Sequence, residues 1–334
     1  MGNLDMTFRS KGSVSDLAVF GGPPVFSERL HVGRPNIGDR GRLLTRMNEL
    51  LDRRWLTNNG PFVQEFEQRI AELSGVKHCI ATCNATAALE VAIRALDLRG
   101  EVIVPAFTFI ATAHALRWHG LTPVFCDIDP RTHNIDPSDV LRHITPRTTG
   151  ILGVHLWGRP CEVDALTEIA RAHGLALLFD AAHAFQCSYK GRMAGQFGDA
   201  EVFSFHATKC VNSGEGGAIV TNDDELARRA RLMINFGFEA FDRVTSFGIN
   251  AKMGEMSAGM GLTSLESLHD FVGAAHRNYK TYECELADLP GITMLGYDRS
   301  ERSNYHYVVL EIDEAVAQIG RDEVQRVLWA ENVL

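Results

Sequence analysis

The sequence has little of what a secreted, membrane or nucleic-acid-binding protein needs. The N-terminal segment MGNLDMTFRSKG lacks the uninterrupted apolar core of a signal peptide, and no apolar run approaches the ~20 residues of a membrane span. Basic residues are outnumbered, 33 Lys and Arg against 42 Asp and Glu, so the formal net charge is −9. Because nucleic acids attract basic surfaces, this charge disfavours a nucleic-acid partner.

Disulfide and metal-binding patterns are also missing. The seven cysteines form an odd set without a CxxC pair, and most lie in apolar runs such as HCIATC and VFCDI. A reduced cysteine in such a run behaves as a small hydrophobic residue. We therefore predict a cytoplasmic protein with no metal site and no membrane partner. The cysteines are Cys79, Cys83, Cys126, Cys161, Cys187, Cys210 and Cys284.

What is present is the pattern of an α/β protein. The 334 residues, 45% hydrophobic and 22% charged, suffice for one large domain and a smaller one. Short apolar runs alternate with amphipathic stretches, as parallel strands covered on both faces require. The runs predict a mostly parallel sheet of about seven strands. They are HCIATC, VIVP, PVFCDI, GILGVH, ALLFD, EVFSFH and GGAIVT.

The pattern changes along the chain and predicts three parts. We expect an N-terminal arm over 1–35, a large domain over 36–250 and a small α+β domain over 251–334. A helical stretch from about Met253 to Leu286 and a strand over Tyr305–Asp313 belong to the last part. The helical pattern that starts near Arg321 has no capping signal before the chain ends, so we expect the small domain to be incomplete.

Several residues that can carry chemistry follow directly after predicted strands. Ligands of open α/β sheets collect at the carboxyl ends of the strands. Ala85 and Thr86 open the helix after HCIATC, where backbone N–H groups and a hydroxyl can hold an anion, although a plain helix cap explains them too. Phe109, after VIVP, could stack on a planar ring or could pack in the core.

Two further strand ends carry ionisable residues. ALLFD ends in Asp180, a buried carboxylate that needs a partner such as a protonated pyridine nitrogen, unless it only caps the next helix. His183 lies three residues on and could equally be a structural histidine. Lys209, in SFHATK, lies in a segment with no other formal charge, where desolvation would favour a nucleophilic amine. A lysine whose head simply reaches solvent is the alternative.

The order and spacing of these residues resemble the DegT/StrS family of nucleotide-sugar aminotransferases, which are fold-type I enzymes dependent on pyridoxal 5′-phosphate. The resemblance runs from about Gly33 to the end of the chain. It is carried by motifs that include WLTNNGPFVQEFE, CNATAALEVAI, VPAFTFIATA, FCDIDPRTHNID, VHLWGRP, DAAHA, SFHATK and GEGGAIVT.

The resemblance implies a role for each matching residue. Lys209 would hold the cofactor as a Schiff base and later move a proton, Asp180 would bond the pyridine nitrogen, and His183 would lie near the ring oxygen. Phe109 would stack on the ring. Ala85, Thr86 and Ser204 would hold the phosphate, joined by Asn250 from the second subunit of a homodimer with shared active sites.

Some positions depart from the family pattern. The family often has Gly at Ala85, and many members carry Arg at Lys252, where a lysine offers only a point charge. A branch with His in place of the lysine catalyses dehydration, and Lys209 argues against that branch. Lys252, Tyr305, His306 and Trp157 are candidate sugar contacts. A simple edge strand explains Tyr305 and His306 equally well, and core packing is the more usual role for a residue such as Trp157.

The stretch NFGFEAFDRVTSFGINAKMGEMSAGMGL is similar to enzymes that aminate C4 of dTDP-4-keto-6-deoxyhexoses in antibiotic deoxysugar biosynthesis. The resemblance thus implies transamination of dTDP-4-keto-6-deoxyglucose to the 4-amino sugar, with L-glutamate as donor and pyridoxamine phosphate as the intermediate cofactor form. Three alternatives stay open. They are amination of a dTDP-3-keto sugar at C3, a non-catalytic regulator or auxiliary subunit, and a nucleotide-binding module that uses GEGG as its phosphate loop.

Overall fold

The computed structural model describes residues 8–334, so the first seven residues of the predicted arm and of the segment inspected for a signal peptide lie outside it. The chain forms two compact units. The sheet unit contains Pro35–Tyr279 and Gly296–Tyr307. The terminal unit combines the residues up to Arg34 with Lys280–Leu295 and Val308–Leu334.

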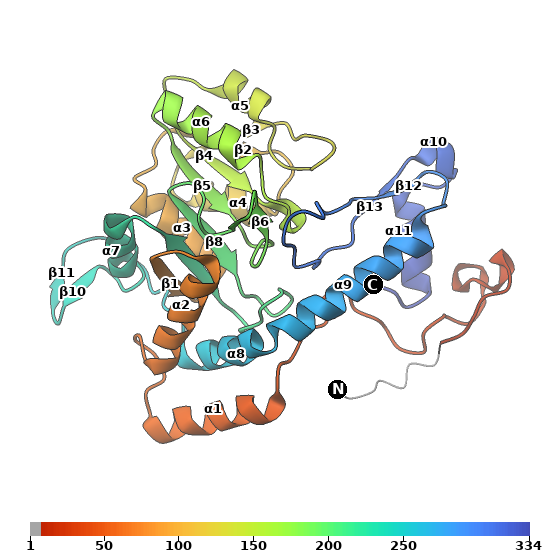
Figure 1. The fold of residues 1–334 in the computed structure, drawn as a ribbon, viewed down its shortest axis with the longest axis horizontal. Helices are drawn as coiled ribbons and strands as arrows, with labels where there is room; N and C mark the ends of the chain where they lie inside the picture. Colours follow the sequence, from red (N-terminus) through yellow and green to blue (C-terminus); the bar gives the residue numbers. More distant parts are fainter. Residues whose placement is uncertain (1–7) are drawn as a thin grey trace. The chain divides into compact units, whose positions relative to one another are not determined.

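A seven-stranded sheet forms the centre of the sheet unit (Figure 1). The strand order is β1-β9-β8-β5-β4-β2-β3, and only β9 runs antiparallel to its neighbours, β1 and β8. The predicted mostly parallel sheet is therefore confirmed. Its strands are β1 (His78–Thr82), β2 (Glu101–Pro105), β3 (Thr122–Cys126), β4 (Thr148–Val154), β5 (Ala176–Asp180), β8 (Ala200–Ser204) and β9 (Gly217–Thr221).

Helices cover both faces of this sheet, which explains why its strands are apolar throughout. Side chains alternate across a strand, so Leu177 and Phe179 join one core and Leu178 joins the other. The first core contains apolar residues of α2, α6 and α8, and the second contains those of α3, α4 and α7. The sheet is thereby held on both sides, and the carboxyl ends of its parallel strands are positioned rigidly.

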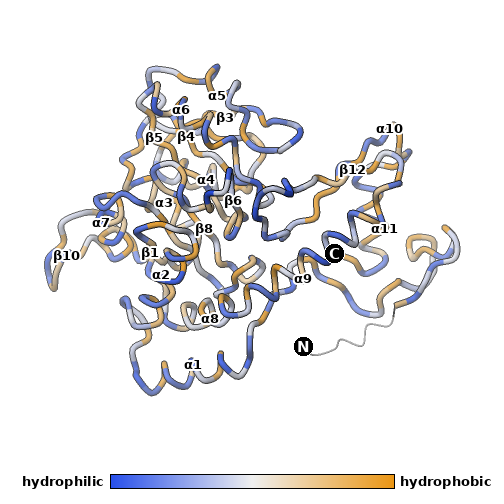
Figure 2. Tube along the Cα trace, viewed as in Figure 1, coloured by the Kyte–Doolittle hydropathy of each residue, from blue (hydrophilic) through white to orange (hydrophobic). Residues whose placement is uncertain are grey.

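The remaining elements of the sheet unit connect or flank these layers. Figure 2 shows apolar segments that interrupt the polar trace of α1, where Leu44 and Leu51 are exposed. Helix α9 runs on into the terminal unit. The helices are α1 (Arg40–Arg53), α2 (Pro61–Ser74), α3 (Ala85–Ala95), α4 (Ile110–Trp118), α5 (Pro137–His143), η3 (Leu156–Gly158), α6 (Val163–His173), α7 (Asp224–Met233), α8 (Glu255–Glu266) and α9 (Leu268–Leu286). Two hairpins join β6 (Ser188–Tyr189) to β7 (Arg192–Met193) and β10 (Phe238–Ala240) to β11 (Arg243–Val244).

The terminal unit ties the N-terminal residues to the C-terminal ones. The Glu331 carboxylate accepts the N–H groups of Ala18 and Val25 and pairs with Lys11 at 3.1 Å. The predicted boundaries at 35/36 and 250/251 remain a proposal. The elements of this unit are η1 (Val14–Asp16), η2 (Ala18–Phe20), β12 (Ile292–Met294), β13 (Leu310–Ile312), α10 (Glu314–Ala317) and α11 (Arg321–Ala330), with β12 and β13 antiparallel.

One predicted strand is shorter than expected. Instead of Tyr305–Asp313, only Leu310–Ile312 is a strand, while the residues up to Tyr307 belong to the sheet unit. Tyr305 has a φ of 51°, in the left-handed region that a strand excludes. None of the helices within residues 8–334 has both the length and the apolar character needed to cross a membrane.

Candidate active site

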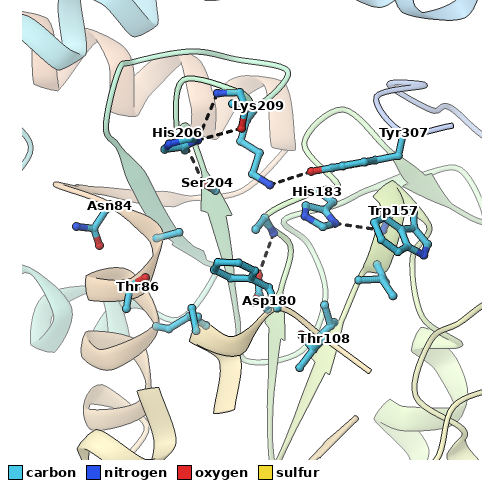
Figure 3. A pocket seen from close by; sticks show the side chains of 18 of the residues that line it. Asn84, Thr86, Thr108, Trp157, Asp180, His183, Ser204, His206, Lys209 and Tyr307 are labelled. Carbon is cyan, nitrogen blue, oxygen red and sulfur yellow. Dashed lines mark hydrogen bonds between the residues drawn. The ribbon is translucent and has the colours of Figure 1, made fainter. Parts of the chain in front are cut away.

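A cavity of about 590 Å³ lies within the sheet unit, at the carboxyl ends of its parallel strands. Val154, Asp180 and Ser204, the last residues of β4, β5 and β8, all line it. Figure 3 shows Lys209, Asp180, His183 and Trp157 gathered around this cavity. The lining residues extend from Asn84 to Tyr307 along the chain, so the fold brings together side chains from distant segments.

Asp180 is a buried carboxylate with neutral hydrogen-bond donors. Its exposed fraction is 6%. Thr112 Oγ1 donates to Oδ2 at 2.8 Å, and the Ala182 N–H donates to Oδ1 at 3.1 Å. Burial raises the pKa of Asp180, which these two bonds and the charge of Lys209 only partly oppose. A cationic ligand group would therefore stabilise the ionised carboxylate.

Lys209 lies in the turn after β8 and reaches the same cavity as Asp180. Its Nζ donates to the hydroxyl of Tyr307 at 2.9 Å. Burial lowers the pKa of Lys209, and the charge of Asp180 opposes that shift. An amine whose pKa is lowered is available more often in its nucleophilic, uncharged form. One ring could contact both Lys209 and Asp180 only if the two side chains share a cavity, and they do.

His183 is held neutral and in one tautomer. Burial lowers its pKa to about 3, with a further contribution from the charge of Lys209. The backbone N–H of Trp157 donates to His183 Nδ1 at 3.2 Å, so the neutral ring carries its proton on Nε2. Trp157 adopts the left-handed conformation, with φ 58°, and its ring stacks on that of His183. The strained backbone of Trp157 thus fixes the His183 ring, which leaves the Nε2–H of His183 as a donor for a ligand in the cavity.

The start of α3 forms a cradle suited to an anion. Asn84 caps the helix by accepting the Ala87 N–H at 2.8 Å, which leaves the N–H groups of Ala85 and Thr86 without intrahelical partners. Gly217 makes the cradle possible, because a Cβ there would lie 2.6 Å from the Ala85 nitrogen. The GEGG segment therefore serves close packing of β9 against α3.

The predicted cofactor residues mostly meet at this cavity. Trp157, one of the predicted sugar contacts, lines it as well. Phe109 does so at the N-terminus of α4, with 70% of its surface exposed. The predicted cofactor residues that line the cavity are Ala85, Thr86, Phe109, Asp180, His183, Ser204 and Lys209.

Four predicted residues do not line the cavity. Lys252 Nζ donates to the side-chain oxygens of Asn235 and of the exposed Asn250, each at 2.8 Å. Tyr305 stacks on His276 instead. His306 is half-buried beside Tyr307, and this burial lowers its pKa to about 4.

Two residues that hydrogen-bond Asp180 and Lys209 carry no recognisable signal in the sequence. Thr112 lies one helical turn inside α4, and no motif distinguishes its hydroxyl from those of other helical threonines. Tyr307 lies in an apolar run that reads as a strand, so its contact with Lys209 is visible only in the folded chain. In the described part of the chain, no group of three or more His, Cys, Asp or Glu side chains is placed to hold a metal ion.

The donors and acceptors of the cavity fit pyridoxal 5′-phosphate. The helix cradle suits its phosphate, the Asp180 carboxylate its ring nitrogen, the His183 Nε2–H its ring oxygen and the Lys209 amine its aldehyde. Among the described lining residues Lys209 is the one Lys or Arg, so within one chain the phosphate would rely on N–H and hydroxyl groups.

Comparisons with known proteins agree with this geometry. The model of the DegT/DnrJ/EryC1/StrS aminotransferase family matches residues 39–334. The chain is 37% identical over 309 residues to an Escherichia coli dTDP-4-amino-4,6-dideoxy-D-glucose transaminase, covering 91% of this chain and 82% of that protein. It is 41% identical over 245 residues to a Caulobacter vibrioides GDP-perosamine synthase, covering 72% and 66%. The crystal structure of DesI in the presence of its TDP-sugar product superposes with a TM-score of 0.93 at 55% identity, over 96% of this chain and 82% of that one.

Proposed function

The chain belongs to the DegT/DnrJ/EryC1/StrS aminotransferase family, and on that premise we propose that it transfers the amino group of L-glutamate to dTDP-4-keto-6-deoxyglucose. It is a pyridoxal-phosphate-dependent sugar aminotransferase with the fold-type I architecture. The proposed product is the 4-amino sugar, as used in antibiotic deoxysugar biosynthesis. One observation carries the proposed chemistry: a half-buried amine with a lowered pKa and a buried carboxylate line the same cavity.

The choice of a dTDP-linked sugar rests on two relatives. DesI, with 55% identity over 96% of this chain, was solved with its TDP-sugar product. The Escherichia coli relative is named for a dTDP-4-amino-4,6-dideoxy sugar. Because this chain aligns with each of them over nine tenths of its length, the same nucleotide and the same ring position are the simplest proposal for it.

When bound, pyridoxal phosphate supplies an aldehyde that takes up the amino group and a protonated ring that spreads carbanion charge. Asp180 would keep the ring nitrogen protonated, since its carboxylate is already oriented by Thr112 and Ala182. His183 would donate from Nε2 to the ring oxygen, and Phe109 would cover one face of the ring.

Lys209 would attach the cofactor and then act as acid and base. Its lowered pKa favours the uncharged amine that attacks an aldehyde, and the same amine can remove or return a proton at the substrate carbon. Asp180, across the same cavity, lends its negative charge to whichever cation forms there.

We also propose a homodimer in which Asn250 reaches the phosphate bound by the second copy. Lys252 Nζ occupies the side-chain oxygen of Asn250, so the amide NH₂ is the group left to donate outward. Lys252 itself would add a positive charge near that phosphate. A second positive charge would help to bind the phosphate, because Lys209 is the one Lys or Arg among the described residues that line the cavity.

We propose Trp157, which lines the cavity, as a sugar contact. His306 and Tyr305 are also proposed as sugar contacts, although they do not line the cavity. All seven cysteines are free, five of them buried, and this supports the proposal of a reducing compartment such as the cytoplasm.

Replacing Lys209 tests the proposed chemistry. In Lys209→Ala we expect no visible absorbance from attached cofactor, no mass increase after borohydride reduction, and a fall in kcat of at least ~10³-fold, since the nucleophile and the proton carrier are lost together. Lys190→Ala, which removes a surface lysine paired with Asp164, is the control and should behave as wild type. Retained covalent attachment in Lys209→Ala would refute the assignment.

The substrate is tested with a panel of keto sugars and L-glutamate, with products resolved by NMR. We expect amination at C4 of the dTDP-4-keto sugar. Amination at C3 of a dTDP-3-keto sugar would replace the proposed regiochemistry. If the protein binds cofactor but fails to convert glutamate to 2-oxoglutarate in a single half-reaction, it is an auxiliary subunit and the proposed function is wrong.

A further inference from the structure

The hydroxyl of Tyr307 lies 2.9 Å from Lys209 Nζ, although the two residues are 98 positions apart. We propose that Tyr307 is a positioning residue that holds and tunes the amine of Lys209. The proposal rests on the role assigned to Lys209 above. Among residues 8–334, Tyr307 is the side chain that hydrogen-bonds this amine, and its ring centre lies 5.6 Å from Nζ. Figure 3 shows the bond across the top of the cavity.

Tyr307 is itself held from several sides. The hydroxyl of Tyr297 lies 2.9 Å from the Tyr307 carbonyl oxygen and 2.9 Å from that of Trp157, and it accepts the Tyr307 N–H at 3.4 Å. The Tyr307 ring packs against His183, with ring centres 4.4 Å apart, and edge-on against Trp157 at 5.4 Å. A hydroxyl fixed in this way can give the flexible lysine side chain a single direction.

Asn304 anchors the same segment. Its side chain is 1% exposed and donates to the carbonyl oxygens of His183 and Phe185, each at 2.9 Å, while its own oxygen accepts the His306 N–H at 3.0 Å. The segment that carries Tyr307 is thus bonded to the loop that carries His183. Both groups are therefore placed around the cavity by one set of contacts.

Protonation decides what the Tyr307 hydroxyl does. Burial raises the pKa of Tyr307 to about 12, so the hydroxyl keeps its proton. A neutral phenol accepts from an ammonium N–H and can also donate to the lone pair of an uncharged amine. The bond to the charged form is the stronger one, so Tyr307 opposes the lowering of the Lys209 pKa by burial. It keeps the amine oriented in both protonation states.

The amine of Lys209 must be released and recaptured in every transamination, and its direction and pKa matter most while it is free. A hydroxyl that stays bonded in both protonation states returns the amine to one place after each release. Tyr307 would therefore act on the reaction through Lys209.

The test titrates the amine in the apoprotein. Wild type and Tyr307→Phe are mixed with pyridoxal phosphate at a series of pH values, and covalent capture is followed by visible absorbance and borohydride trapping. We expect the midpoint of the capture rate to move to lower pH in Tyr307→Phe by roughly half to one unit, because a charge-assisted bond is lost while the ring remains. Tyr189→Phe, whose hydroxyl faces Glu162, should not move the midpoint.

Steady-state kinetics give a second readout. In Tyr307→Phe we expect kcat to fall about tenfold with KM for glutamate changed less than about twofold, since an interaction with the reacting amine is lost while substrate binding is not. Tyr297→Phe, which keeps the Tyr307 hydroxyl but loosens its backbone, should shift the capture midpoint in the same direction by a smaller amount.

An unchanged capture midpoint in Tyr307→Phe would overturn the inference, whatever happens to kcat. That result is distinct from failure of the proposed function, which Lys209→Ala reports by itself. If Lys209→Ala still captures cofactor covalently, the role of Lys209 is wrong, whereas identical titrations of wild type and Tyr307→Phe dismiss only the role of Tyr307.

Discussion

Burial favours the uncharged forms of Asp180, Lys209 and His183, three ionisable residues that line the cavity. It raises the pKa of Asp180 and lowers the pKa values of Lys209 and His183. Lys209 and Asp180 partly compensate each other by opposite charge. A ligand that brings a ring cation to Asp180 would complete this compensation, which explains why a charged pair can persist in a cavity lined mainly by apolar groups.

The depressed pKa of His183 predicts how stability depends on pH. The pKa falls from its ordinary 6.5 to about 3 in the folded apoprotein, so between these values the unfolded chain binds more protons. Stability should therefore decrease as pH falls from 6.5 toward 3. Between pH 7 and pH 4 the unfolding free energy of wild type should fall more than that of His183→Asn, by on the order of 3 kcal/mol.

Urea unfolding of the apoproteins at several pH values measures this difference. The control is His114→Asn, which replaces an exposed histidine of α4 and should keep the wild-type slope. Parallel curves for wild type and His183→Asn would show that His183 is not held neutral by burial.

At the scale of elements, the irregular segment Ser303–Tyr307 brings a side chain to the cavity without being part of a strand or a helix. It turns through Tyr305 at φ 51° and places Tyr307 against Lys209. The buried amide of Asn304 anchors this segment, because irregular backbone has no ladder of its own to satisfy neighbouring carbonyl groups.

We expect Asn304→Ala to destabilise the protein by about 2–4 kcal/mol, since two buried carbonyl oxygens and the His306 N–H lose their partner. Thermal or urea unfolding measures the change. Asn222→Ala, which removes one bond to the exposed Lys77 N–H, should cost less than about 1 kcal/mol. Equal effects of the two substitutions would contradict the anchoring role of Asn304.

The elements themselves were largely predictable. Strands buried on both faces, such as ALLFD before its final Asp180, are mostly apolar, so the seven runs identified the sheet. The end of the chain was harder. Tyr305 and His306 continue an apolar pattern that is typical of a strand, yet the buried Asn304 amide and the Tyr297 hydroxyl hold this segment out of any sheet.

At the scale of the molecule, the proposed homodimer would bring Asn250 of one copy to the phosphate of the other. A complementation experiment tests this sharing. Lys209→Ala and Asn250→Ala, each expected to be strongly impaired, are unfolded together, refolded and assayed. Mixed dimers then contain one site with both Lys209 and Asn250 intact, so we expect roughly a quarter of wild-type activity to return.

If Asn250 served the site of its own chain, no mixed dimer would hold an intact site and activity would stay at the level of the separate variants. Refolding each variant alone provides the control for spontaneous recovery. Sedimentation of the wild type should show a dimer, and a stable monomer with full activity would contradict the shared site.

The sequence by itself determined the sheet, the cavity's place at the strand ends and most cofactor candidates, because these follow from local patterns. An apolar run, a helix start after Asn84 and a charge at the end of a buried strand, such as Asp180, can each be recognised from neighbouring residues. Only the tertiary structure decided that Thr112 orients Asp180 and that Tyr307 bonds Lys209. The first contact joins residues 68 positions apart and the second joins residues 98 positions apart. A local sequence pattern cannot show that two such distant residues come within hydrogen-bonding distance, because only folding brings them together.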